Sequence, residues 1–247
     1  EDLIVSGTLR DTDTTLSFSG DGHTMYFLKD QTLSDLKITA SDIVIDAQGH
    51  TLNLNGTRVI RSCGATSGST VHIKNCTCSI SSPEALYMED STSSFIFENC
   101  VFDLSSNCSI DTGAIEFRGN VVITGDGYSF ILGGYSHTIA SNSNVCVDSG
   151  VSFCVTPTRS DGTFLNFSDD TSLLTLCDAT LNIYQDIQSD ISGNNVILEG
   201  DCSINAVYYG DTYNPLSAIT SGNIEFENAV IDVKENLNLS NMSLRLK

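Results

Sequence analysis

Apolar and polar residues alternate in short runs along most of the chain, and the runs recur at a regular interval. The two clearest are 71–80 (VHIKNCTCSI) and 95–104 (FIFENCVFDL), each with two alternating apolar positions on either side of Asn-Cys. Alternation with a period of two is the pattern of a β-strand with one buried face. The central Asn indicates a turn between two such strands.

Further runs of this kind continue to the end of the chain. Close copies occupy 174–183, 224–233 and 237–246, and looser copies occupy 43–54, 115–123, 145–153 and 196–204. Most neighbours are separated by about 20 to 30 residues, the length of one coil of a three-sided parallel β-helix. The last copy follows its predecessor much more closely than this, which fits a different side of the same coil.

Helical periodicity is almost absent, and the best short helical candidate is 83–89. Most of the 19 glycines lie between the runs, where turns need positive φ, and only three prolines occur. The sequence therefore predicts an all-β parallel β-helix, a solenoid of roughly 20–30-residue coils. We expect it to occupy residues 36–247, continuing or uncapped at the C-terminus, with residues 1–35 as an N-terminal cap or irregular first coil.

Stacked coils bring equivalent residues into columns about 4.8 Å apart. Polar residues recur at or near one predicted turn position, where an amide can bond along the stack and tolerate left-handed backbone. These residues are Asn75, Asn99, Asn120, Asn228 and Asn241, together with Asp178. We expect them to form an asparagine ladder.

The Asn-Cys runs, together with the segment 43–54 (IVIDAQGHTLNL), resemble the pectin-lyase-like right-handed parallel β-helix superfamily. Secreted adhesins, phage tailspikes and polysaccharide lyases share this architecture. The resemblance covers most of residues 36–247 and implies a right-handed fold, while its motifs are structural and carry little chemistry. The segment 113–120 (GAIEFRGN) is also similar to the GGAI and FxxN repeats of chlamydial polymorphic outer-membrane proteins.

The chain contains nine cysteines. Cys76, Cys100 and Cys202 follow the turn residue of their runs, where Ala179, Ala229 and Met242 stand in other copies, which indicates a buried slot for small or soft residues. Two readings stay open for Cys76 and Cys100: stacked core thiols, or a disulfide between adjacent coils if the compartment is oxidising.

The formal net charge is −20, with 11 basic residues against 31 acidic ones. Such a field repels phosphate backbones and anionic lipid, so we expect no nucleic-acid partner. No apolar run is long enough for a membrane span. The chain starts at Glu1 without Met, which favours a processed secreted protein or a fragment. We expect an extracellular or cell-surface location.

Several acidic residues are candidates for site chemistry. Asp-rich turns could supply oxygen ligands to calcium, the one cofactor considered; the candidates are Asp11, Asp13, Asp21 and Asp126. If the chain is an enzyme, the adjacent pair Asp169 and Asp170 could divide the acid and base roles of glycoside hydrolysis. The Gly-His and Arg-x-Lys elements that accompany such a pair in β-helical polygalacturonases are missing downstream. The sequence thus favours a non-catalytic role.

Three tyrosines cluster in 207–214 (VYYGDTYN), which we expect to be a long loop leaving one coil. Tyr208, Tyr209 and Tyr213 are the predicted binding residues, because exposed tyrosines stack on sugars or dock protein partners. The partner would be a glycan or a cell-surface protein.

Three functions follow from these observations. The first is a non-catalytic secreted or surface-displayed β-helix acting as an adhesin passenger or structural stalk. The second is a carbohydrate-active enzyme, either a polysaccharide lyase or a glycoside hydrolase. The third is a fibre or shell subunit that self-associates end to end, because the ends of a solenoid present unpaired strand edges.

Overall fold

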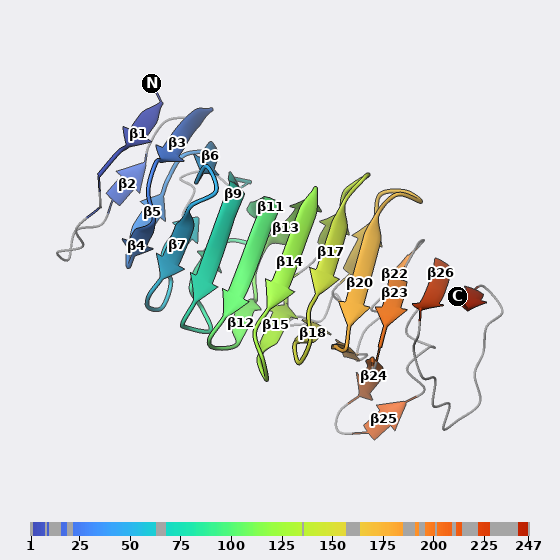
Figure 1. The fold of residues 1–247 in the computed structure, drawn as a ribbon. Coiled ribbons are helices and arrows are strands. Elements are labelled where there is room, and N and C mark those ends of the chain that lie inside the picture. The colour runs from blue at the N-terminus through green and yellow to red at the C-terminus, as the bar shows by residue number, and fades with distance from the viewer. Residues whose placement is uncertain are drawn as a thin grey trace.

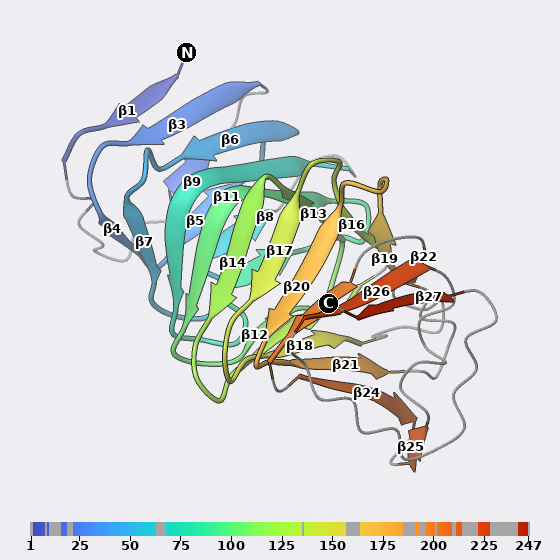
Figure 2. The same ribbon diagram turned by 45° about the vertical axis from the view of Figure 1, so that its right-hand side comes forward.

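The computed structural model describes residues 2–7, 9, 16–18, 22–62, 68–134, 136–156, 164–184, 191–192, 196–200, 202–208, 211–213, 222–227 and 242–246. These residues form strands β1 to β27 and contain no helix. Successive strands stack in parallel as a right-handed β-solenoid of about 7 turns, with about 24 residues per coil. Figures 1 and 2 show the coils following one another from the N-terminus to the C-terminus. The predicted fold class is confirmed.

The solenoid has three sides. Side one contains β1 (Leu3–Val5), β3 (His23–Phe27), β6 (Asp42–Asp46), the first half of β9 (Thr70–Ile80), the first half of β11 (Ser94–Leu104), β13 (Ala114–Arg118), β16 (Ser136–Ile139), β19 (Phe164–Phe167) and β22 (Ile191–Ser192). Side two contains β4 (Gln31–Leu33), β7 (Thr51–Leu54), the second halves of β9 and β11, β14 (Asn120–Thr124), β17 (Asn144–Val147), β20 (Leu173–Cys177), β23 (Val196–Glu199), β26 (Gly222–Glu227) and β27 (Met242–Leu246). Because β9 and β11 continue through the corner, sides one and two form a single 17-stranded sheet.

Side three consists of two separate sheets. The first contains β2 (Leu16–Phe18), β5 (Leu36–Ile38), β8 (Ile60–Ser62) and β10 (Leu86–Met88). The second contains β12 (Cys108–Ile110), β15 (Ser129–Leu132), β18 (Ser152–Val155), β21 (Thr180–Tyr184), β24 (Ser203–Tyr208) and β25 (Asp211–Tyr213). The segment 83–89, the best helical candidate in the sequence, is a turn followed by β10, because its apolar residues fill the next place in an existing parallel sheet.

The core lies between the three sides and consists of inward-facing columns. On side one, register places Phe95 beside Val71 in one neighbouring coil and beside Ile115 in the other. Phenylalanines join the sides at the centre: the ring centroids of Phe97 and Phe102 lie 4.9 Å apart, as do those of Phe102 and Phe130. All of these side chains are at most 1% exposed. The alternation in the sequence therefore separates a dry interior from the outer faces.

A single residue turns the chain from side one to side two in the middle coils. Asn75 and Asn99 both have a φ of 52°, the left-handed conformation that Asn tolerates better than most residues. Asn75 Nδ2 donates to Asp46 Oδ1 at 3.1 Å, and Asn99 Oδ1 accepts the backbone N–H of Asn120 at 3.1 Å. Each of these two side chains thus bonds to a neighbouring coil, Asn75 to a carboxylate and Asn99 to a backbone N–H, and a ladder of stacked asparagine amides stays a prediction.

Two members of the predicted ladder lie elsewhere. Opposite Asn99 stands Gly119, with a φ of 63°, so Asn120 is the first residue beyond the corner. Asp178 lies at the corner between sides two and three, because the run 174–183 spans β20 and β21. The same apolar pattern occurs at two different corners of the solenoid, and the sequence alone does not distinguish the two corners. Asn228 and Asn241 lie outside the described residues.

The range 1–35 already contributes strands to the stack. β1 pairs in parallel with β3, β3 with β6, and β4 with β7. In the described residues, the predicted boundary at residue 36 coincides with no change of architecture.

Candidate functional site

The two sheets of side three meet at a seam between β10 and β12. Within the first sheet, Leu86 pairs with Ile60. In the next coil, however, the N–H of Ser109 bonds to the carbonyl of Pro83 at 2.7 Å, which places β12 beside the turn before β10. Residues 111–113 then pass β10 without being part of a strand. The hydrogen-bonded strand pairing of side three is therefore interrupted between β10 and β12.

A shortened coil accounts for the seam. Register pairs Thr70 with Ser94 and then Ser94 with Ala114, so the second of these coils contains fewer residues than the first. Gly113 lies at the end of this short coil, against Met88 and Ser93. A Cβ on Gly113 would lie 2.5 Å from Met88 Sδ and 2.5 Å from the carbonyl oxygen of Ser93. Its φ of +80° is a second reason for glycine at this position.

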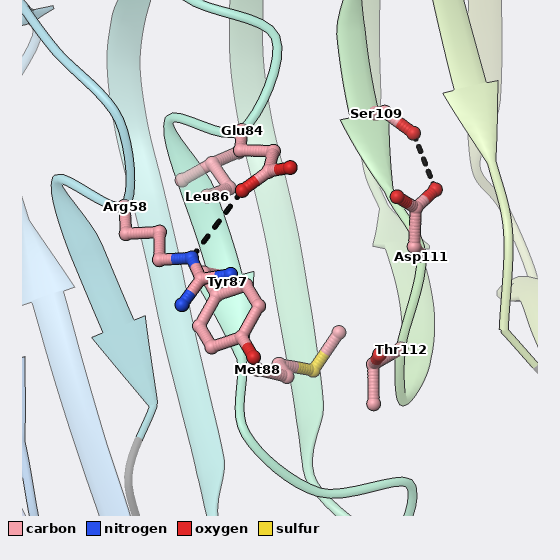
Figure 3. Close-up of a pocket in the computed structure, with 8 residues that line it drawn as sticks. All are labelled: Arg58, Glu84, Leu86, Tyr87, Met88, Ser109, Asp111 and Thr112. Atoms are coloured by element: carbon pink, nitrogen blue, oxygen red, sulfur yellow. Dashed lines mark hydrogen bonds and ion pairs between the residues drawn. The ribbon is translucent and has the colours of Figure 1, made fainter.

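A pocket of about 140 Å³ opens at the seam. It is lined by Arg58, Glu84, Leu86, Tyr87, Met88, Ser109, Asp111 and Thr112 (Figure 3). We call this the seam pocket. Its volume is below the roughly 300–1,000 Å³ of clefts that hold drug-sized ligands. The seam pocket therefore has room for one small group.

Arg58 and Tyr87 form one wall of the seam pocket (Figure 3). The guanidinium carbon of Arg58 lies 4.0 Å from the centre of the Tyr87 ring, a cation–π contact. Arg58 Nε also lies 3.3 Å from Glu84 Oε2, and the N–H of Arg58 bonds to the Glu84 carbonyl at 2.6 Å. These contacts hold Arg58 at a φ of 58°, a conformation that costs a non-glycine residue about 1–2 kcal/mol.

Ser109, Asp111 and Thr112 form the opposite wall (Figure 3). The hydroxyl of Ser109 donates a short hydrogen bond to Asp111 Oδ1. Asp111 is exposed to solvent, whereas Leu86 and Met88 are each 1% exposed and form the apolar part of the lining. Two carboxylates and one guanidinium give the lining a net charge of −1. The pocket thus combines acceptor oxygens, an aromatic ring and an apolar surface.

The outer face of side one carries charges that pair with one another. Register stacks Asp46, Lys74, Glu98 and Arg118 in four successive coils, so the sign of the charge alternates. Lys74 Nζ lies 3.5 Å from Asp46 Oδ2. Arg118 Nε lies 2.7 Å from Glu116 Oε1, and the pKa of Arg118 is raised mainly by this hydrogen bond. The Lys74–Asp46 pair thus joins neighbouring coils, whereas Arg118 and Glu116 pair within one strand.

His72 lies on the same outer face. Its Nε2 is 2.8 Å from Glu98 Oε2. Its pKa is lowered because burial outweighs the attraction of Glu98. Because the lowered pKa leaves the imidazole mostly neutral at pH 7, His72 and Glu98 make a close contact between adjacent coils and not an ion pair.

Asp169 and Asp170 lie in the exposed corner between β19 and β20. Asp169 Oδ1 accepts hydrogen bonds from the N–H of Thr171 at 2.9 Å and from its hydroxyl at 2.5 Å. Hydrogen bonds from Ser141 and then Thr171 lower the pKa of Asp169. This environment favours a permanently ionised turn acceptor, whereas the general acid of a glycosidase needs a raised pKa.

Asp90 has the same arrangement. Its Oδ1 accepts from the N–H and hydroxyl of Thr92, at 2.9 and 2.7 Å, in the corner before β11. Two corners of the solenoid therefore use the sequence Asp-x-Thr-Ser in the same way, and at both the carboxylate orders the turn.

The other predicted sites are only partly described. Asp126 lies in the turn between β14 and β15, while Asp11, Asp13 and Asp21 fall outside the described residues. The described part of the chain contains no group of three or more His, Cys, Asp or Glu side chains placed to hold a metal ion.

The predicted tyrosine loop is a hairpin where it is described. Tyr208 ends β24 and Tyr213 lies in β25, and the two strands pair antiparallel, with Tyr208 opposite Asp211 and Tyr213 opposite Ala206. Tyr209 lies outside the described residues. Figures 1 and 2 show β25 projecting away from the stack. In the described residues this segment is therefore a pair of strands, where the sequence predicted a loop.

Cys76 and Cys100 stack in adjacent coils as free thiols, with their Sγ atoms 3.5 Å apart. Cys78 Sγ also lies 3.5 Å from Cys76 Sγ. The pKa of Cys100 is raised by its contact with Cys76 and by burial. Cys202 does not belong to this column. It directly precedes β24, which pairs with β21, and so lies at the corner between sides two and three beside Ala179.

No family model, curated protein or solved structure matches the chain. Nor does any helix of the described residues have the length and apolar character needed to cross a membrane.

The seam pocket was not predicted from the sequence. Its walls come from the turn before β8, the turn before β10, β10 itself and the segment that begins with β12, so no short motif unites them. The signal that could have revealed it is the short spacing between the apolar runs that begin at Phe95 and Ile115, together with Gly113.

Proposed function

We propose that this chain is a non-catalytic, secreted or surface-displayed β-helix that acts as an adhesin passenger or structural stalk. The observation that carries the proposal is the uninterrupted register of sides one and two, which forms one 17-stranded sheet. Side two alone stacks ten described strands, from β4 to β27, at about 4.8 Å between neighbours, so it runs for roughly 43 Å along the rod.

Contacts between coils support a mechanical role. Arg61 Nη2 lies 2.5 Å from Asp35 Oδ1 on side three, and Lys74 pairs with Asp46 across coils of side one in the same way. Inside, the hydroxyls of Ser62, Ser69 and Ser93 form a buried chain with Oγ–Oγ distances of 2.6 and 2.8 Å. Each coil is thus tied to the next by its core and by polar groups, as a stalk requires.

The resemblance to pectin-lyase-like β-helices and chlamydial surface-protein repeats points to the same role. The proposed partner is a glycan or cell-surface protein, bound along an outer face or at the projecting segment that contains Tyr208 and Tyr213. The acidic field of the chain favours partners with basic surfaces.

A paired assay distinguishes this role from the enzymatic alternative. The full chain is screened on glycan and surface-protein arrays with and without calcium, and each bound polysaccharide is then assayed for new reducing ends and unsaturated products. Binding without product is expected. Product formation that is lost in both D169N and D170N would replace the proposal with a carbohydrate-active enzyme.

One observation favours self-association as a second candidate. Strand β1, at the start of the stack, carries Leu3 at 39% and Ile4 at 64% exposure. Exposed apolar strand edges pair readily with other chains. Sedimentation velocity over a hundredfold range of concentration tests this: a fibre or shell subunit would form larger species that I4K prevents, whereas an isolated stalk would sediment unchanged.

A further inference from the structure

We propose that Cys146 and Cys177 together bind one thiophilic divalent cation, of the class of Zn²⁺ and Cd²⁺, on the outer face of side two. The two cysteines belong to neighbouring coils, in β17 and β20, which lie side by side (Figure 1). An ion held by both thiolates would cross-link these coils from the outside. Such a site goes beyond the stalk role, and its test does not depend on that role.

Both thiols are accessible from solvent. In β17 and β20 they alternate with the buried residues Val145, Val147 and Leu176, so they point away from the core. Each is a free cysteine of intermediate exposure. An ion can therefore reach this pair without entering the dry interior of the solenoid.

The distance between the two sulfurs fits a shared ion. Cys146 Sγ and Cys177 Sγ lie 3.9 Å apart. A tetrahedral zinc ion with Zn–S bonds of about 2.3 Å holds two sulfur ligands about 3.8 Å from each other. The two thiols are thus already separated like two ligands of one ion.

The register of the strands favours a shared ion over a disulfide. Cys146 pairs with Thr175, so Cys177 stands two residues farther along the neighbouring strand. Diagonal neighbours of this kind are about 7–8 Å apart, beyond the Cα–Cα separation of roughly 4.4–6.8 Å in disulfides. Cys76 and Cys100 stand directly opposite each other instead. Two bonds to one ion can span the diagonal, whereas a single S–S bond requires the backbone to move.

Neighbouring groups fit the proton chemistry of metal binding. Burial, followed by the contact with Cys146, raises the pKa of Cys177 to about 12, and burial also raises the pKa of Cys146. Both thiols must therefore lose a proton when an ion binds. Cys177 Sγ donates to Glu199 Oε2 at 3.5 Å, so this carboxylate is placed to take the Cys177 proton on its way to solvent.

The reaction is a ligand exchange. Two S–metal bonds form, two protons leave, and the ion keeps water at its other positions, with no change of oxidation state. Soft thiolates select zinc-class ions, whereas calcium and magnesium prefer oxygen ligands. The pair should therefore discriminate between these classes, although the whole chain is acidic and attracts cations of either kind.

The probe is Cd²⁺, because its bonds to thiolate absorb in the ultraviolet and its bonds to carboxylate do not. It is titrated into the full chain at pH 7.5 with a phosphine reductant present. We expect the thiolate absorbance to saturate at one ion per chain, to be lost on adding excess Zn²⁺ and to persist in excess Ca²⁺.

Three variants locate the site. C146A and C177A each remove one of the two ligands from an outer face and should weaken Cd²⁺ binding at least about tenfold. C154A is the matched control, because Cys154 also alternates with core residues but stands between Ile131 and Asn182 on side three, with no cysteine opposite. Its Kd should stay within about twofold of wild type. Absorbance that survives in C146A and C177A, or falls equally in all three variants, would overturn the proposal.

A second measurement uses the unaltered chain. Zn²⁺ should slow maleimide labelling of Cys146 and Cys177, followed by peptide mapping, and leave the rate at Cys154 unchanged. Equal rates with and without Zn²⁺ would refute the site, as would a Cys146–Cys177 disulfide formed in oxidised glutathione, because the two backbones would then be closer than a shared ion requires. None of these results affects the stalk proposal, which fails through product formation in the polysaccharide assay or through assembly of the chain.

Discussion

The imidazole of His137 should make the stability of the solenoid depend on pH. His137 faces inward from β16, in register with Ile115 and Leu165, and is 0% exposed. Neither ring nitrogen reaches hydrogen-bonding geometry in the described residues. Burial lowers the pKa of His137 from its ordinary 6.5 to about 4, although a contact with the backbone of Gly133 offsets part of the effect. The folded state therefore holds a neutral imidazole in an apolar core.

The sign and size of the effect follow from proton linkage. Below pH 6.5 the unfolded chain binds a proton that the folded chain excludes until about pH 4, so stability falls as the pH drops through this window. Integrating between pH 7.5 and pH 5.0 gives a loss of about 2 kcal/mol from this residue alone. His72, whose pKa is also lowered, adds to the loss in the same direction.

The variant H137L isolates the contribution of His137 to the pH dependence of the free energy of unfolding. Leucine fits the apolar column and removes two unsatisfied nitrogens, so we expect a gain of about 1–3 kcal/mol at pH 7.5. Urea unfolding followed by circular dichroism at pH 7.5 and 5.0 should show the pH-dependent loss shrinking by about 2 kcal/mol in H137L. If wild type and H137L lose equal stability on acidification, His137 is not a buried neutral base.

Three further predictions concern the core and its corners. N99A should cost about 1–2 kcal/mol and N99G much less, by urea unfolding, because the corner requires left-handed backbone. F130A should cost about 3–5 kcal/mol in the same assay, since its ring contacts Phe102, and a loss below about 1 kcal/mol would contradict the packing. Refolding in oxidised glutathione should yield a Cys76–Cys100 disulfide by peptide mapping, because neighbouring parallel strands are about 4.8 Å apart, within disulfide range. Native protein should resist the same oxidant, since the raised pKa of Cys100 suppresses the thiolate.

The architecture could be predicted from the sequence because each coil of a solenoid repeats the same pattern of apolar and turn residues. The runs 71–80 and 95–104 align residue by residue in the structure, as their shared pattern predicted. Each coil needs only period-two alternation and a turn residue, and both are local signals. The local pattern does not tell on which side of the solenoid a run lies. The run 174–183 has the same spacing as 71–80 but spans the corner between sides two and three, so Asp178 and Cys202 were assigned to the wrong columns.

The seam pocket could not be predicted for a related reason. Arg58 and Glu84 meet because the chain returns after one coil, and Asp111 joins them one coil later. Such contacts depend on the lengths of coils, which vary between the corners, and not on any motif. The predicted residue Asp169 illustrates the converse, because its hydrogen bonds to Thr171 serve the turn in which it lies.

Gly113 links the short coil to the seam, and its replacement tests that connection. In G113A the new methyl group would meet Met88 Sδ and the Ser93 carbonyl, both at 2.5 Å, so the coil or Met88 must move. Gly127 is a matched control, because its φ of +77° is close to the +80° of Gly113 but nothing lies within 4 Å of its Cβ position. Both variants bear the strain of left-handed backbone, about 1–2 kcal/mol.

The difference between the two variants therefore reports the close approach alone. We expect G113A to be less stable than G127A by a further ~1–3 kcal/mol, the cost of overpacking a well-packed site, measured by urea unfolding. Equal stabilities in the two variants would mean that the coils are not in contact at Gly113, and that the seam does not arise from the shortened coil.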